Sequence, residues 1–168
     1  SFAENALTYL PQIVQASGNK LIVGRANLGG FTLERHWKHV AQHEANPDGK
    51  NGSPYRGGKY SLKDMLTKDK WDFITIQQVS YKSHDLKTYQ PFADNLHAYI
   101  KKHAPDAKIM AHQIWAYRID DPRFKAANKG KEPHTHRMMY DQVRNAYHTL
   151  AGRLDLGMLP SGDAMFLA

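Results

Sequence analysis

Hydrophobic residues recur every three or four positions in several stretches of the chain, which is the spacing of one face of an α-helix. The first stretch is marked by six apolar residues: Phe2, Ala6, Leu7, Leu10, Ile13 and Val14. The helices predicted by this reading cover residues 2–14, 33–45, 89–100 and 139–154, with a shorter helix over 62–66. Ser17-Gly18-Asn19 is a helix-ending signal, and it predicts the end of the first helix.

Short apolar runs lie between these helices. They predict strands over residues 21–23, 72–76, 107–114 and 156–159. Polar, charged or glycine- and proline-rich segments predict loops over 46–59, 77–85 and 119–133, and Pro160-Ser161-Gly162 closes the last strand. Helices and strands therefore alternate, and this order predicts a three-layer α/β fold, with a parallel sheet covered by helices on both faces, in one domain over residues 1–168.

The alternation begins with a helix, whereas a doubly wound α/β domain usually opens with a strand that feeds its first helix. We therefore expect a first strand upstream of Ser1. Polar residues cluster after three of the predicted strands, over 27–32, 77–80 and 112–117. Because ligands bind outside the carboxyl ends of parallel strands, these clusters predict the position of the functional site.

Composition narrows the classes of function. The chain has 168 residues, of which 41% are hydrophobic and 23% charged, as in a globular domain rather than a disordered chain. A net charge of +7 favours anionic partners, but no dense Lys/Arg block indicates a nucleic-acid tail, so nucleic-acid binding ranks last. No apolar run approaches the roughly 20 residues of a membrane helix. The chain has no cysteine, which excludes disulfides and thiolate metal sites.

Four blocks carry a resemblance to a known family. They are Ser1-Phe2-Ala3-Glu4-Asn5-Ala6 followed by 27–37 (Asn-Leu-Gly-Gly-Phe-Thr-Leu-Glu-Arg-His-Trp), 72–80 (Asp-Phe-Ile-Thr-Ile-Gln-Gln-Val-Ser), and 112–117 (His-Gln-Ile-Trp-Ala-Tyr). In this order and spacing they resemble the SGNH/GDSL hydrolase superfamily, in particular an often secreted bacterial branch. The resemblance implies a flavodoxin-like fold, a secreted or periplasmic location, and serine hydrolysis of O-acyl esters on a carbohydrate or lipid, with O-acetyl groups as the expected case.

The resemblance also implies roles for individual residues. Ser1 matches the nucleophile, although Ser1 and Glu4 also form a capping-box pattern that could simply start a helix. Gly30 matches a glycine whose N–H helps to bind the oxyanion, where only a residue without a side chain allows close approach. Family members commonly place an Asn amide in the third block, and here Gln77 or Gln78 takes that place. We favour Gln78 as the donor, with Gln77 in substrate binding.

The catalytic base of the family is a histidine in an Asp-x-x-His motif beyond the last strand. Asp163 is followed three positions later by Phe166, so the resemblance places the catalytic His and Asp outside residues 1–168. We therefore expect a second chain or a further segment to complete the fold. The reaction needs neither a metal nor an organic cofactor.

Several aromatic and histidine residues are candidates for substrate binding, each with a plainer reading. The candidates are His36, Trp37, His112 and Trp115. Trp37 could stack on a sugar or could be an ordinary core aromatic. His36 also shares a helical face with His39 and His43, which could bind a metal ion, but Glu44 lies off that face and a solvated or packed stripe is favoured. Arg35, Arg118 and Arg123 could meet an anionic substrate or remain solvated.

Two hypotheses therefore stand. The first is an esterase of SGNH type acting on a small-molecule or glycan ester, with no nucleic-acid or membrane partner. The alternative is a non-catalytic carbohydrate-binding module derived from the same fold, which the unmatched Asp-x-x-His motif and the unusual third block favour. A fold alone does not decide between them.

Overall fold

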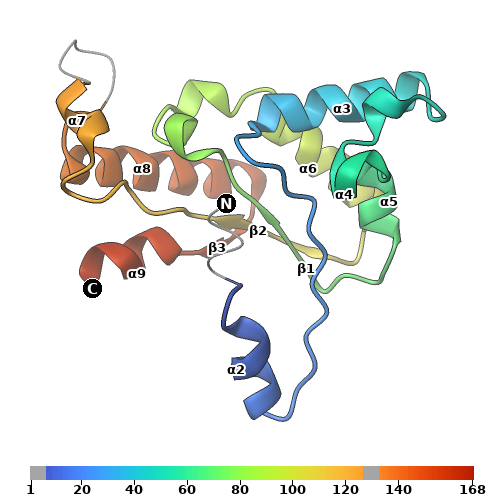
Figure 1. The fold of residues 1–168 in the computed structure, drawn as a ribbon, viewed down its shortest axis with the longest axis horizontal. Coiled ribbons are helices and arrows are strands. Elements are labelled where there is room, and N and C mark those ends of the chain that lie inside the picture. Colours follow the sequence, from blue (N-terminus) through green and yellow to red (C-terminus); the bar gives the residue numbers. More distant parts are fainter. Residues whose placement is uncertain (1–6, 127–132) are drawn as a thin grey trace.

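Three parallel strands form the centre of the molecule in a computed structural model that describes residues 7–126 and 133–168. They are β1 (Phe73–Ile76), β2 (Lys108–His112) and β3 (Gly157–Leu159), in the spatial order β1-β2-β3 (Figure 1). Ile76 lies opposite Ala111, and His112 lies opposite Leu159. Both strand pairs are parallel, so the three carboxyl ends lie at one edge of the sheet.

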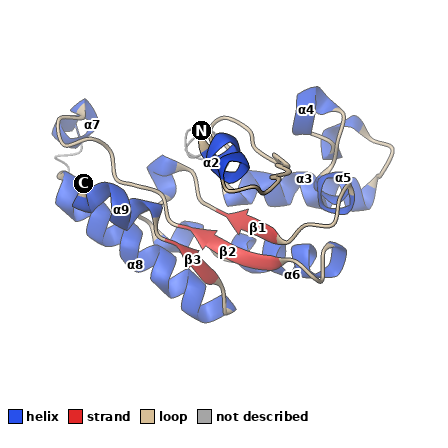
Figure 2. Ribbon diagram, turned by 90° about the horizontal axis from the view of Figure 1, so that it is seen from below, coloured by secondary structure: helices blue, strands red, loops and turns tan. Residues whose placement is uncertain are grey.

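Helices cover both faces of this sheet, and the views of Figures 1 and 2 agree on which helices lie where. The helices of the described residues are α2 (Leu10–Ala16), α3 (Leu33–Ala45), α4 (Tyr55–Gly58), α5 (Leu62–Thr67), α6 (Phe92–His103), α7 (Pro122–Ala126), α8 (His136–Leu154) and α9 (Ser161–Leu167). Short 3₁₀ turns occupy 50–52, 80–82 and 86–88. Helices α3, α6 and α8 lie on one side of the sheet, and α2 and α9 lie on the other (Figures 1 and 2). The predicted three-layer α/β architecture is confirmed.

Capping residues explain where the main helices begin. The Thr32 hydroxyl accepts a hydrogen bond from the Arg35 N–H at 3.1 Å at the start of α3, and Thr135 caps α8 in the same way. Helix α5 begins with a capping box in which Ser61 and Asp64 satisfy each other's backbone N–H groups. These side chains bind N–H groups that have no partner within the helix.

The core lies between the sheet and the layer of α3, α6 and α8. Its largest fully buried side chains include Tyr89, Ile114, Met139, Tyr147 and Leu150. The rings of Tyr89 and Tyr147 meet edge to face, with centroids 5.7 Å apart. The polar ends of both rings are also satisfied, because the Tyr89 hydroxyl donates to the Ser83 carbonyl and the Tyr147 hydroxyl accepts from the Gln78 N–H.

The N-terminal part of the chain departs from the predictions. Residues 2–6 of the helix predicted over 2–14 lie outside the described residues. In the described part the helix is α2, which begins at Leu10 and buries none of its residues, and 63% of the surface of Ile13 is exposed. The strand predicted over 21–23 is wrong, since this segment forms no ladder. An extended segment becomes a strand only with a hydrogen-bonding neighbour, and no described residue provides one.

Other differences are smaller. The segment that begins with Ser161 is helix α9, not only a strand-closing turn. The loops predicted over 46–59 and 119–133 contain the short helices α4 and α7, and residues 127–132 lie outside the described residues. The strands over 72–76, 107–114 and 156–159 and the helices over 33–45 and 62–66 are confirmed, with boundaries moved by a few residues at most.

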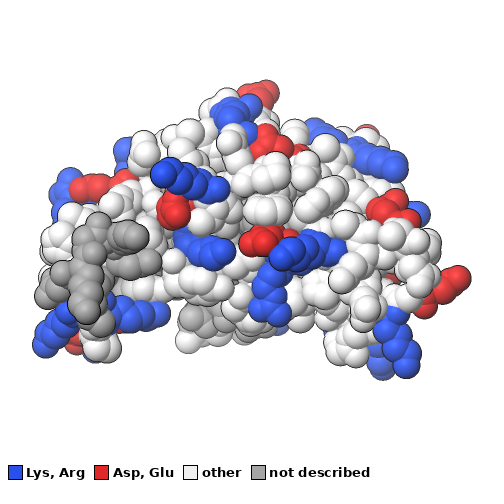
Figure 3. All heavy atoms as spheres, turned by 90° about the horizontal axis from the view of Figure 1, so that it is seen from above, with Lys and Arg blue, Asp and Glu red and all other residues white. Residues whose placement is uncertain are grey.

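Charges of both signs mix on the helical face formed by α3, α6 and α8. Figure 3 shows Lys and Arg side chains interspersed with Asp and Glu on this face rather than gathered in a continuous stripe. Two of the pairs are Lys38 with Glu34, at 2.9 Å, and Arg153 with Asp94. Within the described residues, no helix has the length and hydrophobicity needed to cross a membrane.

Gly162 tests how tightly α9 is held against the sheet. A Cβ added there would lie 2.4 Å from the Ile114 carbonyl oxygen, so we expect Gly162→Ala to lower the free energy of unfolding by about 1–3 kcal/mol. Gly152 is the matched control, because it lies in α8 with no atom within 4 Å of an added Cβ. Gly152→Ala should raise stability by about 0.5–1 kcal/mol, since alanine favours helix interiors. Urea unfolding measures both free energies, and equal changes for the two variants would contradict the close packing of Gly162 against Ile114.

Candidate active site

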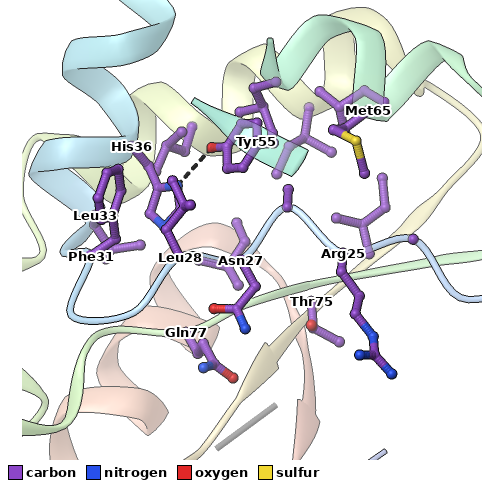
Figure 4. Close-up of a pocket in the computed structure, with 18 of the residues that line it drawn as sticks. Arg25, Asn27, Leu28, Phe31, Leu33, His36, Tyr55, Met65, Thr75 and Gln77 are labelled. Atoms are coloured by element: carbon purple, nitrogen blue, oxygen red, sulfur yellow. Dashed lines mark hydrogen bonds between the residues drawn. The ribbon is translucent and has the colours of Figure 1, made fainter. Parts of the chain in front are cut away.

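A groove of about 450 Å³ runs beside the sheet, between the segment 21–31 and strand β1 (Figure 4). Every residue from Phe73 to Ser80 contributes to one wall, and the facing wall is the chain that leads into α3. An apolar part of the lining comes from α5 and α6, through Leu62, Met65, Leu66, Leu96 and Ile100. The groove therefore joins an apolar channel to the carboxyl end of β1, where two of the three predicted polar clusters meet.

The turn before α3 forms one side of the polar end. The Phe31 N–H donates to the Leu28 carbonyl at 3.2 Å, which closes the turn around Gly29 and Gly30. Gly30 has a φ of 69°, a backbone conformation that side chains disfavour. A Cβ at Gly30 would have no atom within 4 Å, and Gly30 is one of the residues that line the groove. The residue predicted to bind an oxyanion thus lies on the groove, in a turn that itself requires glycine.

Gln78 belongs to the scaffold, which corrects its predicted role as an oxyanion donor. Its side-chain oxygen accepts from the Leu33 N–H at 3.1 Å and from the Val79 N–H at 2.9 Å. Those two donors fix the orientation of the amide, so its nitrogen faces Thr88, with 3.1 Å to the carbonyl and 3.3 Å to the hydroxyl. The side chain is buried and both of its amide hydrogens are used. Gln78 therefore has no N–H left for a substrate.

Gln77, unlike Gln78, faces the groove. It follows Ile76 at the carboxyl end of β1, lines the groove, and carries a buried side-chain oxygen without a hydrogen-bond partner. Figure 4 shows the Gln77 and Asn27 side chains extending into the groove from its two walls. An amide that is not bound to the protein is free to turn its N–H₂ group or its oxygen toward a ligand. Of the two adjacent glutamines, the structure leaves Gln77 available for chemistry.

The partly buried His36 and the buried Tyr55 form a pair at the side of the groove. His36 Nδ1 and the Tyr55 hydroxyl share a hydrogen bond of 2.7 Å, and the two rings stack with centroids 5.8 Å apart. Phe31 packs edge to face on His36 and also lies under the Arg35 guanidinium. Sequence reasoning missed Tyr55, because it lies in a glycine-rich segment that carried no signal of a buried position.

Burial sets the protonation of this pair. Burial, together with the neighbouring His39 and Arg35 side chains, lowers the pKa of His36 to about 4, so the imidazole is neutral near pH 7. Burial also raises the pKa of Tyr55, so its hydroxyl keeps its proton. His36 and Tyr55 are therefore a neutral hydrogen-bonding pair on the wall of the groove.

The other predicted substrate-binding residues lie outside the groove lining. Trp37 packs on the core, edge to face with Tyr99 at 6.4 Å, so the plainer reading of this tryptophan is correct. His112 ends β2, and its Nε2 lies 3.0 Å from the Ser161 hydroxyl at the start of α9. Trp115 follows β2 and is not among the residues that form the groove. Of the predicted set, His36, Gln77 and Gln78 come together with Gly30.

Ser1, the predicted nucleophile, lies outside the described residues. Two of the arginines are already paired: Arg118 with Asp120, and Arg123 with Asp121 at 2.6 Å and with the face of the Tyr117 ring. The ring of His39 binds the Asn51 carbonyl. Within 7–126 and 133–168, no three His, Asp or Glu side chains gather closely enough to hold a metal ion.

Replacing Gln78 and replacing Gln77 should have different effects on the free energy of unfolding. Gln78→Ala removes the partners of the Leu33 and Val79 N–H groups and of the Thr88 carbonyl, so we expect a loss of at least about 2 kcal/mol in the free energy of unfolding. Gln77→Ala should change it by less than about 0.5 kcal/mol. Urea unfolding of both variants measures this difference, and a larger loss for Gln77→Ala would contradict the assignment.

The pH dependence of stability should report the His36 environment. The folded-state pKa of about 4 lies below the ordinary value of 6.5, so the unfolded chain binds more protons between these values. The stability contributed by neutral His36 is therefore complete above pH 6.5 and is lost as the pH falls toward 4. Between pH 7.5 and 4.5, His36→Gln should lose about 2 kcal/mol less stability than wild type. Urea unfolding at both pH values tests this, and identical losses would contradict a buried neutral ring.

Comparison with known proteins places this geometry in a family. The chain resembles the crystal structure of a DUF4886 family protein from Bacteroides uniformis ATCC 8492, with a TM-score of 0.80 and 24% identity over 98% of this chain and 65% of that one. It also resembles a Slackia heliotrinireducens protein described as a "putative SGNH hydrolase", with a TM-score of 0.57 and 20% identity over 90% of this chain and 72% of that one.

These structural similarities concern the fold. At such identities they show a shared fold, and the chain spans only 65% of the length of the B. uniformis protein. No curated protein matches the chain. A family model described as a domain of unknown function, DUF4886, matches residues 1–165. Since this match covers nearly the whole chain, the protein belongs to the DUF4886 family.

Proposed function

We propose that this chain is the greater part of an SGNH-type serine hydrolase that cleaves O-acyl esters, with O-acetyl groups on a carbohydrate or lipid as the expected substrates. The observation that carries the proposal is the polar end of the groove. There the Gly30 backbone and the Gln77 amide, whose oxygen has no hydrogen-bond partner, lie beside an apolar channel at the carboxyl end of a parallel strand. The fold shared with the S. heliotrinireducens protein and the sequence blocks around Ser1 support the same reading.

In the proposed reaction, the Ser1 hydroxyl attacks the ester carbonyl and its proton passes to a general base. The carbonyl oxygen becomes an oxyanion, and the Gly30 N–H and the Gln77 amide N–H₂ donate hydrogen bonds to it. The alcohol then leaves with a proton, and water hydrolyses the acyl-enzyme by the same route in reverse order. Gln77 takes the donor role first expected for Gln78, because Gln78 is occupied by Thr88.

The general base is not His36. With a pKa of about 4, its neutral ring is a weak proton acceptor at neutral pH, and a hydrogen bond to Tyr55 already occupies Nδ1. The proposal therefore takes the base from a histidine outside residues 1–168, as the sequence resemblance implies. His36 and Tyr55 instead shape the wall on which the substrate rests.

Ester hydrolysis by the complete gene product tests this function. With p-nitrophenyl acetate, Ser1→Ala should abolish turnover above the buffer rate, and Gln77→Ala should lower kcat by about 10²-fold, the usual cost of losing one oxyanion donor. Gln42→Ala is the control for residue type, since Gln42 is exposed on α3 and should leave kcat unchanged.

The competing reading is a carbohydrate-binding module that keeps the groove and lacks the chemistry. Turnover that Ser1→Ala leaves intact, or no turnover by the complete product, would overturn the hydrolase proposal and favour that module. A rise in KM with kcat unchanged for Gln77→Ala would also contradict an oxyanion role, because that role acts on kcat.

A further inference from the structure

A serine and a histidine meet at the carboxyl edge of the sheet, outside the lining of the groove. His112 is the last residue of β2, and its Nε2 lies 3.0 Å from the hydroxyl oxygen of Ser161, the first residue of α9. The hydroxyls of Ser17 and Ser83 instead donate to backbone carbonyl oxygens, which do not take up a proton. An imidazole nitrogen is a base, so Ser161 has the partner that activates a hydroxyl as a nucleophile.

The strand register explains how the sheet presents this pair. Ile76 and Ala111 lie opposite each other in β1 and β2, and both belong to the core on the side of α3, α6 and α8. Side chains alternate along a strand, so the next residues, Gln77 and His112, point to the other face. That face carries α9, which brings Ser161 to His112 (Figures 1 and 2). The Gln77 amide therefore lies on the same edge and the same face as the pair.

The two members of the pair differ in their access to solvent. His112 is 6% exposed, whereas Ser161 is only half-buried, so a ligand can reach the hydroxyl while the ring stays within the protein. Burial lowers the pKa of His112 below its ordinary value, and the ring is therefore neutral near neutral pH. A neutral ring that carries its proton on Nδ1 accepts the Ser161 hydroxyl proton at Nε2.

The surface beside the pair suits a short acyl group. Leu159 lies opposite His112 in the register of β2 and β3, and 38% of its surface is exposed. Because paired residues of neighbouring strands share a face, Leu159 lies beside His112 on the face that carries Ser161. Its exposed methyl groups offer an apolar contact, and the Gln77 amide offers N–H donors to a carbonyl oxygen. An uncharged acyl group needs both kinds of contact.

We propose that Ser161 and His112 form a second acyl-accepting site, in which Ser161 takes a short acyl group from an activated ester. The Ser161 oxygen attacks the acyl carbonyl carbon, and the hydroxyl proton passes to His112 Nε2. The bond between the carbonyl carbon and the ester oxygen then breaks, and the alcohol leaves with the proton from His112. The products are an ester of Ser161 and the free alcohol, and the reaction consumes only the ester donor.

This site is independent of the proposed hydrolase reaction. Ser161 and His112 both belong to the described residues, so their chemistry requires neither Ser1 nor a histidine outside residues 1–168. An acyl group on Ser161 would lie against Nε2 of a ring that is 6% exposed, which leaves little room for the water that hydrolysis needs. We therefore expect a single lasting acylation of Ser161 rather than continuous turnover.

Acetylation measured residue by residue tests the proposal. The complete gene product carrying Ser1→Ala is incubated with p-nitrophenyl acetate, and peptide mass spectrometry follows the acetylation of each residue. Ser53 is the matched control, because it is also half-buried and no histidine of the described chain binds its hydroxyl. We expect Ser161 to be acetylated about 10²-fold faster than Ser53, since a positioned general base contributes at least that factor. Equal rates at the two serines would overturn the proposal.

The role of His112 has its own readout. In the Ser1→Ala background, His112→Ala should lower the acetylation rate of Ser161 to that of Ser53, and added imidazole should raise it again by about tenfold, because it replaces the missing base. Lysine acetylation in the same spectra is the internal reference, since an amine reacts without this histidine. His148→Ala is the control for residue type, because His148 is exposed on α8.

The remaining outcomes each decide the proposal. Unchanged acetylation of Ser161 in His112→Ala, or a loss that imidazole does not restore, would show a purely structural hydrogen bond and overturn it. The comparison with Ser53 keeps both serines and His112, so it holds even where His112→Ala lowers stability. Turnover that depends on Ser1, without acetylated Ser161, would overturn this inference and leave the hydrolase standing. Acetylated Ser161 in a product without turnover would do the reverse.

Discussion

One buried amide holds the parts of this molecule in their places. The Gln78 side chain binds the first N–H of α3, the next residue of its own loop and the Thr88 carbonyl, and its backbone N–H binds the Tyr147 hydroxyl of α8. The segment before α3, the carboxyl end of β1, the approach to α6 and the middle of α8 thus meet at a single residue. In a medium of low dielectric, such a fully satisfied network is strong and admits few alternative arrangements. These hydrogen bonds of Gln78 fix the relative positions of the segments that form the mouth of the groove.

Because Gln78 is held in the interior, adjacent residues at this strand end have different roles. Side chains alternate along an extended backbone, so residues that follow one another at a strand end face different surroundings. Here Gln78 turns into the protein and Gln77 into the groove. A similar division separates His36 from Trp37, since one lines the groove with Tyr55 and the other packs on Tyr99. Pairs of adjacent polar or aromatic residues in the blocks therefore contain one functional candidate and one structural residue.

Sequence patterns predicted the architecture well, because amphipathic helices such as 33–45 and 139–154 and apolar runs such as 72–76 depend on local periodicity. They predicted the site less well. Which of two glutamines faces a ligand depends on contacts with Thr88 and Leu33. The place of Tyr55 on the groove beside His36 likewise depends on a contact between residues 19 positions apart. For the segment 21–23, the local pattern predicted a strand that does not form. Its apolar pattern is that of a strand, but a strand also needs a hydrogen-bonding neighbour, which the local sequence does not specify.

The separation of Leu33 and Gln78 along the chain has a consequence for synthesis. These residues are 45 positions apart, yet their hydrogen bond anchors one wall of the groove to the other. At roughly 5–20 residues per second, a ribosome needs several seconds to add Gln78 after Leu33 has been made. During that interval the segment before α3 lacks the hydrogen bond that later ties it to the end of β1. The groove can therefore take its final shape only after the chain has been made as far as Gln78.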